Sequence, residues 1–103
     1  MAIAWDGSAT TPAAPINGSD ASVDTTGITI TLPTDTQAVI LTTSAAAFWK
    51  RGAHDGTGVW ISAPANTPRT LYGLGATIGV KAATGTTAVY VEALSPTNTR
   101  MGR

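Results

Sequence analysis

From residue 27 onward, apolar and polar residues alternate in short segments, with the period of two that is typical of half-buried β-strands. The segment 27–33, GITITLP, alternates Ile28, Ile30 and Leu32 with threonines and ends at a proline. We expect the three apolar side chains to face a core and the threonines to face outward. The proline predicts the end of the strand, because it cannot donate a backbone hydrogen bond to a neighbouring strand.

Six further segments have the composition of strands and are separated by turn-forming glycine, proline, asparagine and aspartate. They are 34–44, 45–51, 58–63, 69–75, 77–83 and 86–94. Residues 38–41, AVIL, form a continuous apolar run, which predicts a strand that is covered on both faces. In the last segment, we expect Val89 and Val91 on one face and Tyr90 and Glu92 on the other.

The spacing of these segments, about 8–12 residues, predicts an all-β protein: a single small antiparallel β-sandwich or jelly-roll-like barrel. We place this core at residues 27–95, after an extended N-terminal arm at 1–26 and before a short C-terminal tail at 96–103. The arm is rich in Ala, Thr, Ser, Gly and Pro and is too poor in large apolar residues to form a core. Trp5 and Ile16 are candidate anchors by which it docks on a neighbouring subunit; a disordered leader, or Trp5 folded back on its own domain, is the alternative.

The charge content is low, and it excludes several classes of partner. Only 12% of the 103 residues are charged, and the net charge is zero. We therefore expect neither a nucleic-acid nor a membrane-surface partner, and we expect association with other protein chains, which a nearly uncharged surface favours. The chain has no cysteine, which excludes disulfides, thiol nucleophiles and cysteine-ligated zinc. Its N-terminus has neither the basic region nor the apolar run of a signal peptide.

The segment 50–58, KRGAHDGTG, contains the only histidine and is the one candidate for catalytic or metal chemistry. His54 and Asp55 are adjacent, so in an extended segment their side chains point to opposite faces and cannot form a catalytic pair. A zinc site needs three or four ligands, and the other acidic residues are scattered. We therefore predict that the protein is not an enzyme and has no catalytic, cofactor or metal site.

We interpret the same segment as a hairpin loop, in which the Asp–Gly pair provides a tight turn. Lys50, Arg51 and His54 would be solvated or would face a partner, and they join Trp5 and Ile16 as candidate interface residues. Aromatic and arginine side chains near this loop fit that interpretation, since they are the usual anchors of interfaces.

Three aromatic residues offer an alternative function. Trp49, Trp60 and Tyr72 could form a platform on which sugar rings stack, as in a carbohydrate-binding module. Large aromatic residues are also needed to fill the core of so small a sandwich, and we favour that role for them.

The segment 27–95 resembles small virion proteins of tailed bacteriophages. The resemblance rests on a strand that ends in Leu-Pro, the following DTQAVILTTS, a strand with aromatic residues, a proline-containing loop, and the final GTTAVYVEAL. Proteins of this kind are small β-sandwich or jelly-roll modules that decorate or cement the capsid, commonly as trimers. The arm and the 50–58 loop lie outside the resemblance.

The resemblance implies a capsid decoration or cement protein that stabilises the shell. Its partners would be the major capsid protein and two further copies of itself, in a homotrimer. It would be made in the host cytoplasm and would lie on the outer surface of the virion. A head-fibre or connector-associated virion protein is the alternative within the same class, and the carbohydrate-binding module is the alternative from another.

Overall fold

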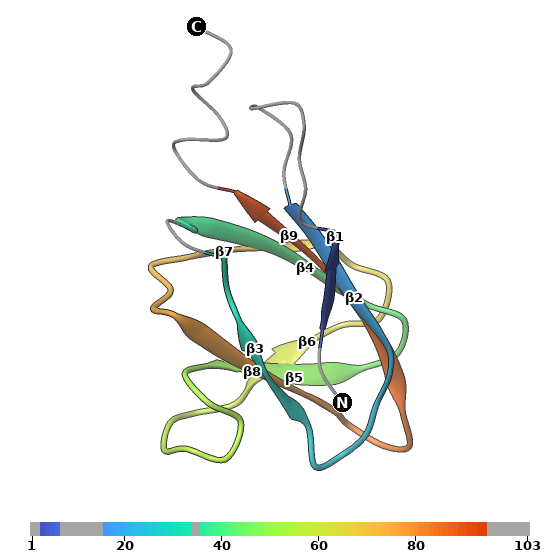
Figure 1. Cartoon of the computed structure of the whole chain (residues 1–103). Helices are drawn as coiled ribbons and strands as arrows, with labels where there is room; N and C mark the ends of the chain where they lie inside the picture. The colour runs from blue at the N-terminus through green and yellow to red at the C-terminus, as the bar shows by residue number, and fades with distance from the viewer. Residues whose placement is uncertain (1–2, 7–15, 34–35, 95–103) are drawn as a thin grey trace, which may run out of the picture.

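The computed structural model describes residues 3–6, 16–33 and 36–94, which form two antiparallel sheets packed face to face (Figure 1). This part of the chain contains β-strands and no α-helix, and none of it is a helix long and apolar enough to cross a membrane. The strands are β1 (Ala4–Asp6), β2 (Ile16–Val23), β3 (Ile28–Thr31), β4 (Ala38–Thr43), β5 (Ala47–Arg51), β6 (Ile61–Ala63), β7 (Arg69–Tyr72), β8 (Thr77–Ala82) and β9 (Thr87–Leu94).

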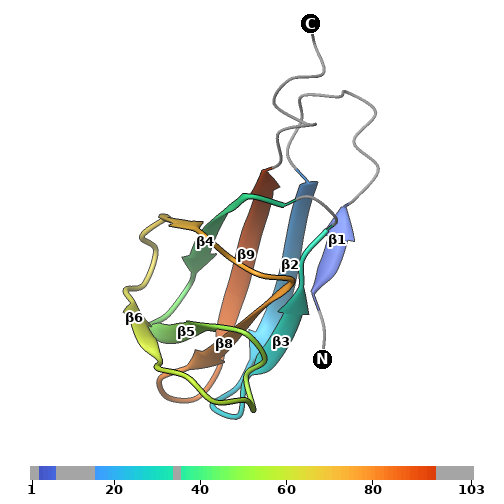
Figure 2. The same ribbon diagram turned by 90° about the vertical axis from the view of Figure 1, so that its left-hand side faces the viewer.

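One sheet has five strands in the order β1-β2-β9-β4-β7, and the other has four in the order β3-β8-β5-β6. Apart from the β1–β2 and β5–β6 pairs, consecutive strands lie in opposite sheets, so the chain repeatedly crosses between the layers (Figure 2). The predicted all-β antiparallel sandwich is confirmed, and each segment that was predicted as a strand between residues 27 and 94 contains one.

The core lies between the two sheets and is built from the residues that alternate inward along each strand. Ile28, Ile30 and Leu32 are exposed by 6%, 1% and 8%, as the alternation in their segment predicts. Val89 and Val91 also face inward, whereas Tyr90 and Glu92 are exposed. The core cluster consists of Val23, Ile28, Ile30, Leu32, Val39, Leu41, Ala47, Trp49, Ala63, Leu71, Ile78, Val80, Val89 and Val91.

Strand β4 corrects one detail of the prediction. Val39 and Leu41 are fully buried on the inner face, but Ile40 on the outer face is only half-buried. The continuous apolar run therefore marks a strand flanked on both sides, by β7 and β9, and not one whose two faces are both covered.

The largest correction concerns the predicted arm, residues 1–26. Strand β2 lies within the five-stranded sheet, between β1 and β9, with Ile16 opposite Ala93. The boundary predicted at residue 27 is therefore wrong, because the sandwich already includes β2 and, through it, β1. Residues 7–15 of the predicted arm and the predicted tail at 96–103 lie outside the described residues.

A β-bulge explains why the sequence pattern of β2 was misleading. Asp20 pairs with Val89 and Val23 pairs with Thr87, so two residues of β2 face one residue of β9. The Asp20 carboxylate, on the inner face, accepts the backbone N–H of Ser22 at 2.9 Å and so stabilises the bulge. A polar inner residue and a shifted register together remove the period of two.

The turn from β2 to β3 depends on a glycine. Gly27 has a φ of +90°, and an added Cβ would lie 2.6 Å from the carbonyl oxygen of Val80. The Asp24 carboxylate accepts the backbone N–H groups of Thr26 at 3.0 Å and of Gly27 at 3.2 Å, which fixes the turn. A side chain at residue 27 would therefore meet both backbone strain and a steric clash.

We predict that Gly27→Ala destabilises the fold by more than about 2 kcal/mol, because it combines a positive φ with a backbone clash. Gly85→Ala is the matched control, since Gly85 has a φ of +59° but open space around it. The control should lose only about 1 kcal/mol. Urea unfolding of both variants measures the difference, and equal losses would contradict the packing described for Gly27.

Candidate functional site

The loop 52–60 joins β5 to β6, and these two strands pair as a hairpin, as the sequence predicts. Its turn lies one residue earlier than expected. The N–H of Gly56 donates to the carbonyl of Ala53 at 3.0 Å, so His54 and Asp55 are the central residues of the turn. This geometry places His54 toward the four-stranded sheet and makes the loop a cover for its outer face.

Three residues form a row across the outer face beneath this loop. Gly79 on β8 pairs with Thr29 on β3 and with Lys50 on β5. A Cβ added at Gly79 would lie 2.7 Å from the Cα and 2.9 Å from the backbone nitrogen of His54. The backbone of the loop therefore occupies the space that a side chain at residue 79 would fill.

The other two members of the row hold the loop in place. The Thr29 hydroxyl oxygen accepts the backbone N–H of His54 at 2.9 Å and lies 2.7 Å from its Nδ1. On the far side of Gly79, the Lys50 ammonium donates to the carbonyl of Gly56 at 2.5 Å. The loop is thus attached to the sheet on both sides of the glycine.

These contacts correct the expected exposure of two candidate interface residues. Lys50 is only 1% exposed, and His54 is half-buried, so of the two predicted roles, solvated or partner-facing, the solvated one holds for neither. Arg51 is exposed, as expected, and its guanidinium donates to the carbonyl of Tyr72 at 2.9 Å. Arg51 also lies 5.1 Å from the ring centroid of Trp49, so it links the end of β5 to the other sheet.

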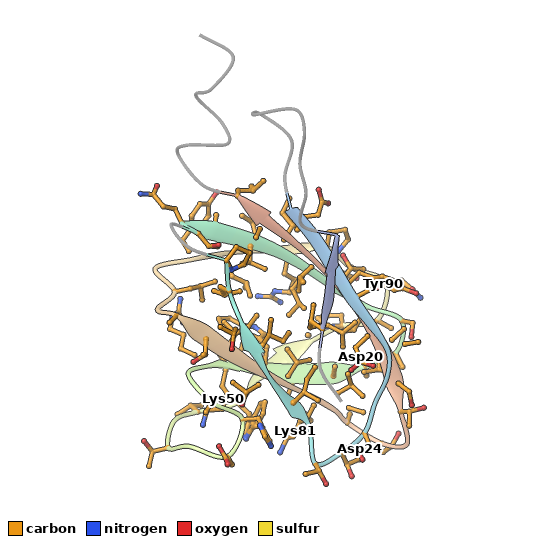
Figure 3. The ribbon with its side chains drawn as sticks, in the orientation of Figure 1. Asp20, Asp24, Lys50, Lys81 and Tyr90 are labelled. Atoms are coloured by element: carbon orange, nitrogen blue, oxygen red, sulfur yellow. The ribbon has the colours of Figure 1, made fainter. Side chains whose placement is uncertain are left out.

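Beside the loop, two lysines converge on one indole. The ammonium of Lys81 lies 4.5 Å from the ring centroid of Trp60, and that of Lys50 lies 5.6 Å from it. Lys81 also lies 5.7 Å from the ring of Phe48, its register partner on β5. We call Phe48, Lys50, Trp60 and Lys81 the outer cluster; its two lysines are labelled near the 52–60 loop in Figure 3.

The remaining two candidate interface residues lie in the other sheet. Trp5 is the middle residue of β1 and pairs with Gly18, and Ile16 begins β2. Their side chains lie outside the described part of the structure, so the predicted anchoring contacts stay predictions. The five candidates are therefore divided between the two sheets.

The proposed sugar platform is not assembled. Trp49 is 4% exposed and belongs to the core, which confirms the packing role that we favoured for it. Trp60 lies in the outer cluster of the four-stranded sheet, whereas Tyr72 is on β7 of the five-stranded sheet. The three rings cannot contact one ligand side by side.

A second surface lies on the outer face of the five-stranded sheet. Tyr72 on β7 is 67% exposed and Tyr90 on β9 is 52% exposed. They lie on either side of β4, where Ala38 pairs with Tyr72 and Thr42 pairs with Tyr90. We call these residues, together with Ile40 between them, the tyrosine face.

We predict that Thr29→Val releases the loop without disturbing the strand, because valine keeps the shape of threonine but removes the hydroxyl that bonds to His54. Amide hydrogen exchange at His54 should become faster by about five-fold or more, as expected for the loss of a hydrogen bond worth about 1 kcal/mol. Thr31→Val is the control, since Thr31 is exposed on the same face of β3. Unchanged exchange at His54 in Thr29→Val would contradict the attachment.

Within the described residues, no group of three or more His, Cys, Asp or Glu side chains is placed to hold a metal ion. The outer cluster and the tyrosine face are the surfaces from which a function can be argued. A comparison of the chain with protein-family models, with curated proteins and with solved structures found no match.

Proposed function

We propose that this protein is a non-enzymatic structural component of a tailed-bacteriophage virion, a decoration or cement protein that binds the major capsid protein on the outer surface of the capsid. The observation that supports it best is the tyrosine face. Two large, exposed aromatic side chains lie on a sheet surface on which, among the described residues of β4, β7 and β9, only Glu92 is charged.

Such a surface is suited to association. Tyrosine buries a large apolar area and keeps a hydroxyl for hydrogen bonding, and it is enriched in the centres of protein interfaces. A sheet surface with few charges can be desolvated at low cost, because few ionic groups lose their hydration. The capsid as the specific partner comes from the sequence resemblance, and the tyrosine face is the surface that would bind it.

We also propose that the protein forms a homotrimer. The number of three copies comes from the sequence resemblance. Closed assemblies protect sheet edges that would otherwise pair with other chains. The edge strand β7, only four residues long, carries Tyr72 of the tyrosine face.

We predict that light scattering on the purified protein gives a mass three times that of the 10.4 kDa chain. The mass should not change on dilution through the micromolar range, as expected for a closed assembly. A monomer both in solution and on the particle would contradict this part of the proposal.

We predict that the protein co-sediments saturably with capsids of the phage that encodes it, prepared from a strain in which its gene is deleted. Tyr90→Ser should weaken this binding by about ten-fold or more, because it removes a central aromatic anchor. Val59→Ser is the matched control, since Val59 is 79% exposed but lies in the loop on the opposite sheet. Its binding should equal that of the wild type.

The proposal fails if capsids do not bind the protein, or if purified virions contain none of it by mass spectrometry. Saturable binding of neutral host-surface glycans without capsid binding would instead favour the carbohydrate-binding alternative. Equal losses in Tyr90→Ser and Val59→Ser would leave the capsid as partner but would reject the tyrosine face as the contact.

A further inference from the structure

The outer cluster holds more positive charge than its surroundings neutralise. The ammonium groups of Lys50 and Lys81 approach the same indole, that of Trp60, at 5.6 and 4.5 Å. Among the described residues, their partners are a backbone carbonyl and the faces of two aromatic rings. Rings and carbonyls attract a cation but carry no net charge, and buried charges in proteins are normally paired with a counter-ion.

The described acidic residues are engaged or lie elsewhere. Asp24 accepts the two backbone N–H groups that fix the β2–β3 turn. Asp20 faces the core and bonds to the bulge, and Glu92 is on the other sheet. Asp55 is exposed in the turn of the loop and is not among the partners of either lysine. The cluster is therefore complementary to an anion from outside.

The exposure of the side chains in the outer cluster indicates which of them a ligand could contact. Lys50 is fully buried and cannot move toward a ligand, whereas Lys81, Trp60 and Phe48 are half-buried and line the surface. A ligand would therefore meet one reachable ammonium beside the rings of Trp60 and Phe48, with a second fixed positive charge beneath.

This arrangement favours a carboxylate on a polypeptide over other anions. Nucleic acid is held by many phosphate contacts, and the cluster offers only two cations in a chain with zero net charge. A neutral sugar needs a free aromatic face, and the Trp60 ring already interacts with two ammonium groups. A glutamate or aspartate side chain, whose methylene groups can pack on the two rings, matches both the charge and the aromatic surroundings of the cluster.

We infer that the outer cluster is a docking site for an acidic, carboxylate-bearing segment of a partner protein. The inference rests on the proposed function in that the protein works by association, and it adds a second contact surface on the sheet opposite the tyrosine face. The carboxylate pairs with Lys81, and the buried Lys50 strengthens the attraction without having to be ordered on binding. Because the cluster is already held by the loop, binding loses little conformational entropy.

The test is a titration of the full chain with a short poly-glutamate peptide, in which the tryptophan fluorescence of the protein reports binding. A poly-glutamine peptide of equal length is the uncharged control. We expect saturable binding of poly-glutamate only. Binding should weaken as the ionic strength rises to about 0.15 M, where the Debye length is about 8 Å. In Trp60→Phe the fluorescence change should disappear.

Lys81→Gln should weaken the binding by about five-fold, the size expected for one partly exposed ion pair. Arg69→Gln is the matched control, because it removes one positive charge from an exposed position on β7 of the other sheet. Arg69→Gln should bind like the wild type, and Lys81→Arg should retain binding. Melting curves of all three variants check that they are folded.

Equal affinities in Lys81→Gln and Arg69→Gln would overturn the inference, since they would show attraction to net charge alone. Binding of polygalacturonate or heparin in preference to poly-glutamate would also overturn it, in favour of an acidic glycan. The capsid assay separates this outcome from the proposed function. Capsid binding that is unaffected by Lys81→Gln rejects the docking site only, whereas peptide binding without capsid binding rejects the capsid as partner only.

Discussion

The seating of the 52–60 loop on the four-stranded sheet requires that residue 79 has no side chain. Strand β8 passes beneath the loop, and the Cα of His54 lies 2.7 Å from the place where a Cβ of residue 79 would be. Real Cβ atoms do not tolerate so short a distance, and the obstructing atoms belong to backbone. A glycine within a strand lowers the stability of that strand. Here the contacts with the backbone of the loop offset that loss of stability.

The chemistry of the outer face follows from this contact. The loop covers the Lys50 side chain. Lys50 is therefore a buried cation, and its ammonium donates a hydrogen bond to the carbonyl of Gly56. The loop also brings Trp60, at its end, over the two lysines. Within the described part of the chain, no loop covers the outer face of the opposite sheet, and its tyrosines are exposed. The two faces of the sandwich thus differ in character: one is cationic and aromatic, and the other is nearly neutral.

The strands from β3 to β9 could be predicted because their inward residues are mainly apolar: β3 and β9 show the alternation, and β4 shows a continuous apolar run. Strand β2 could not, because its inner face includes Asp20 at a bulge and its pairing depends on β9, far away in the sequence. The burial of Lys50 could not be predicted either, because no local sequence pattern shows that a loop folds back over a sheet. One signal was present: Gly79 interrupts an otherwise strand-like segment, and such a glycine often marks the close approach of another backbone.

The seating of the loop is tested most directly by proton NMR of the outer cluster in Gly79→Ala. In the wild type, the lysine side chains near the Trp60 ring should show ε-methylene resonances shifted upfield by the ring current. We expect Gly79→Ala to abolish the shift of Lys50, to reduce that of Lys81, which also lies near the Phe48 ring, and to leave the core methyl resonances of Val80 in place. Gly75→Ala, in open space, should change neither. Upfield shifts that persist unchanged in Gly79→Ala would contradict the claim that this glycine positions the loop and, through it, the cluster.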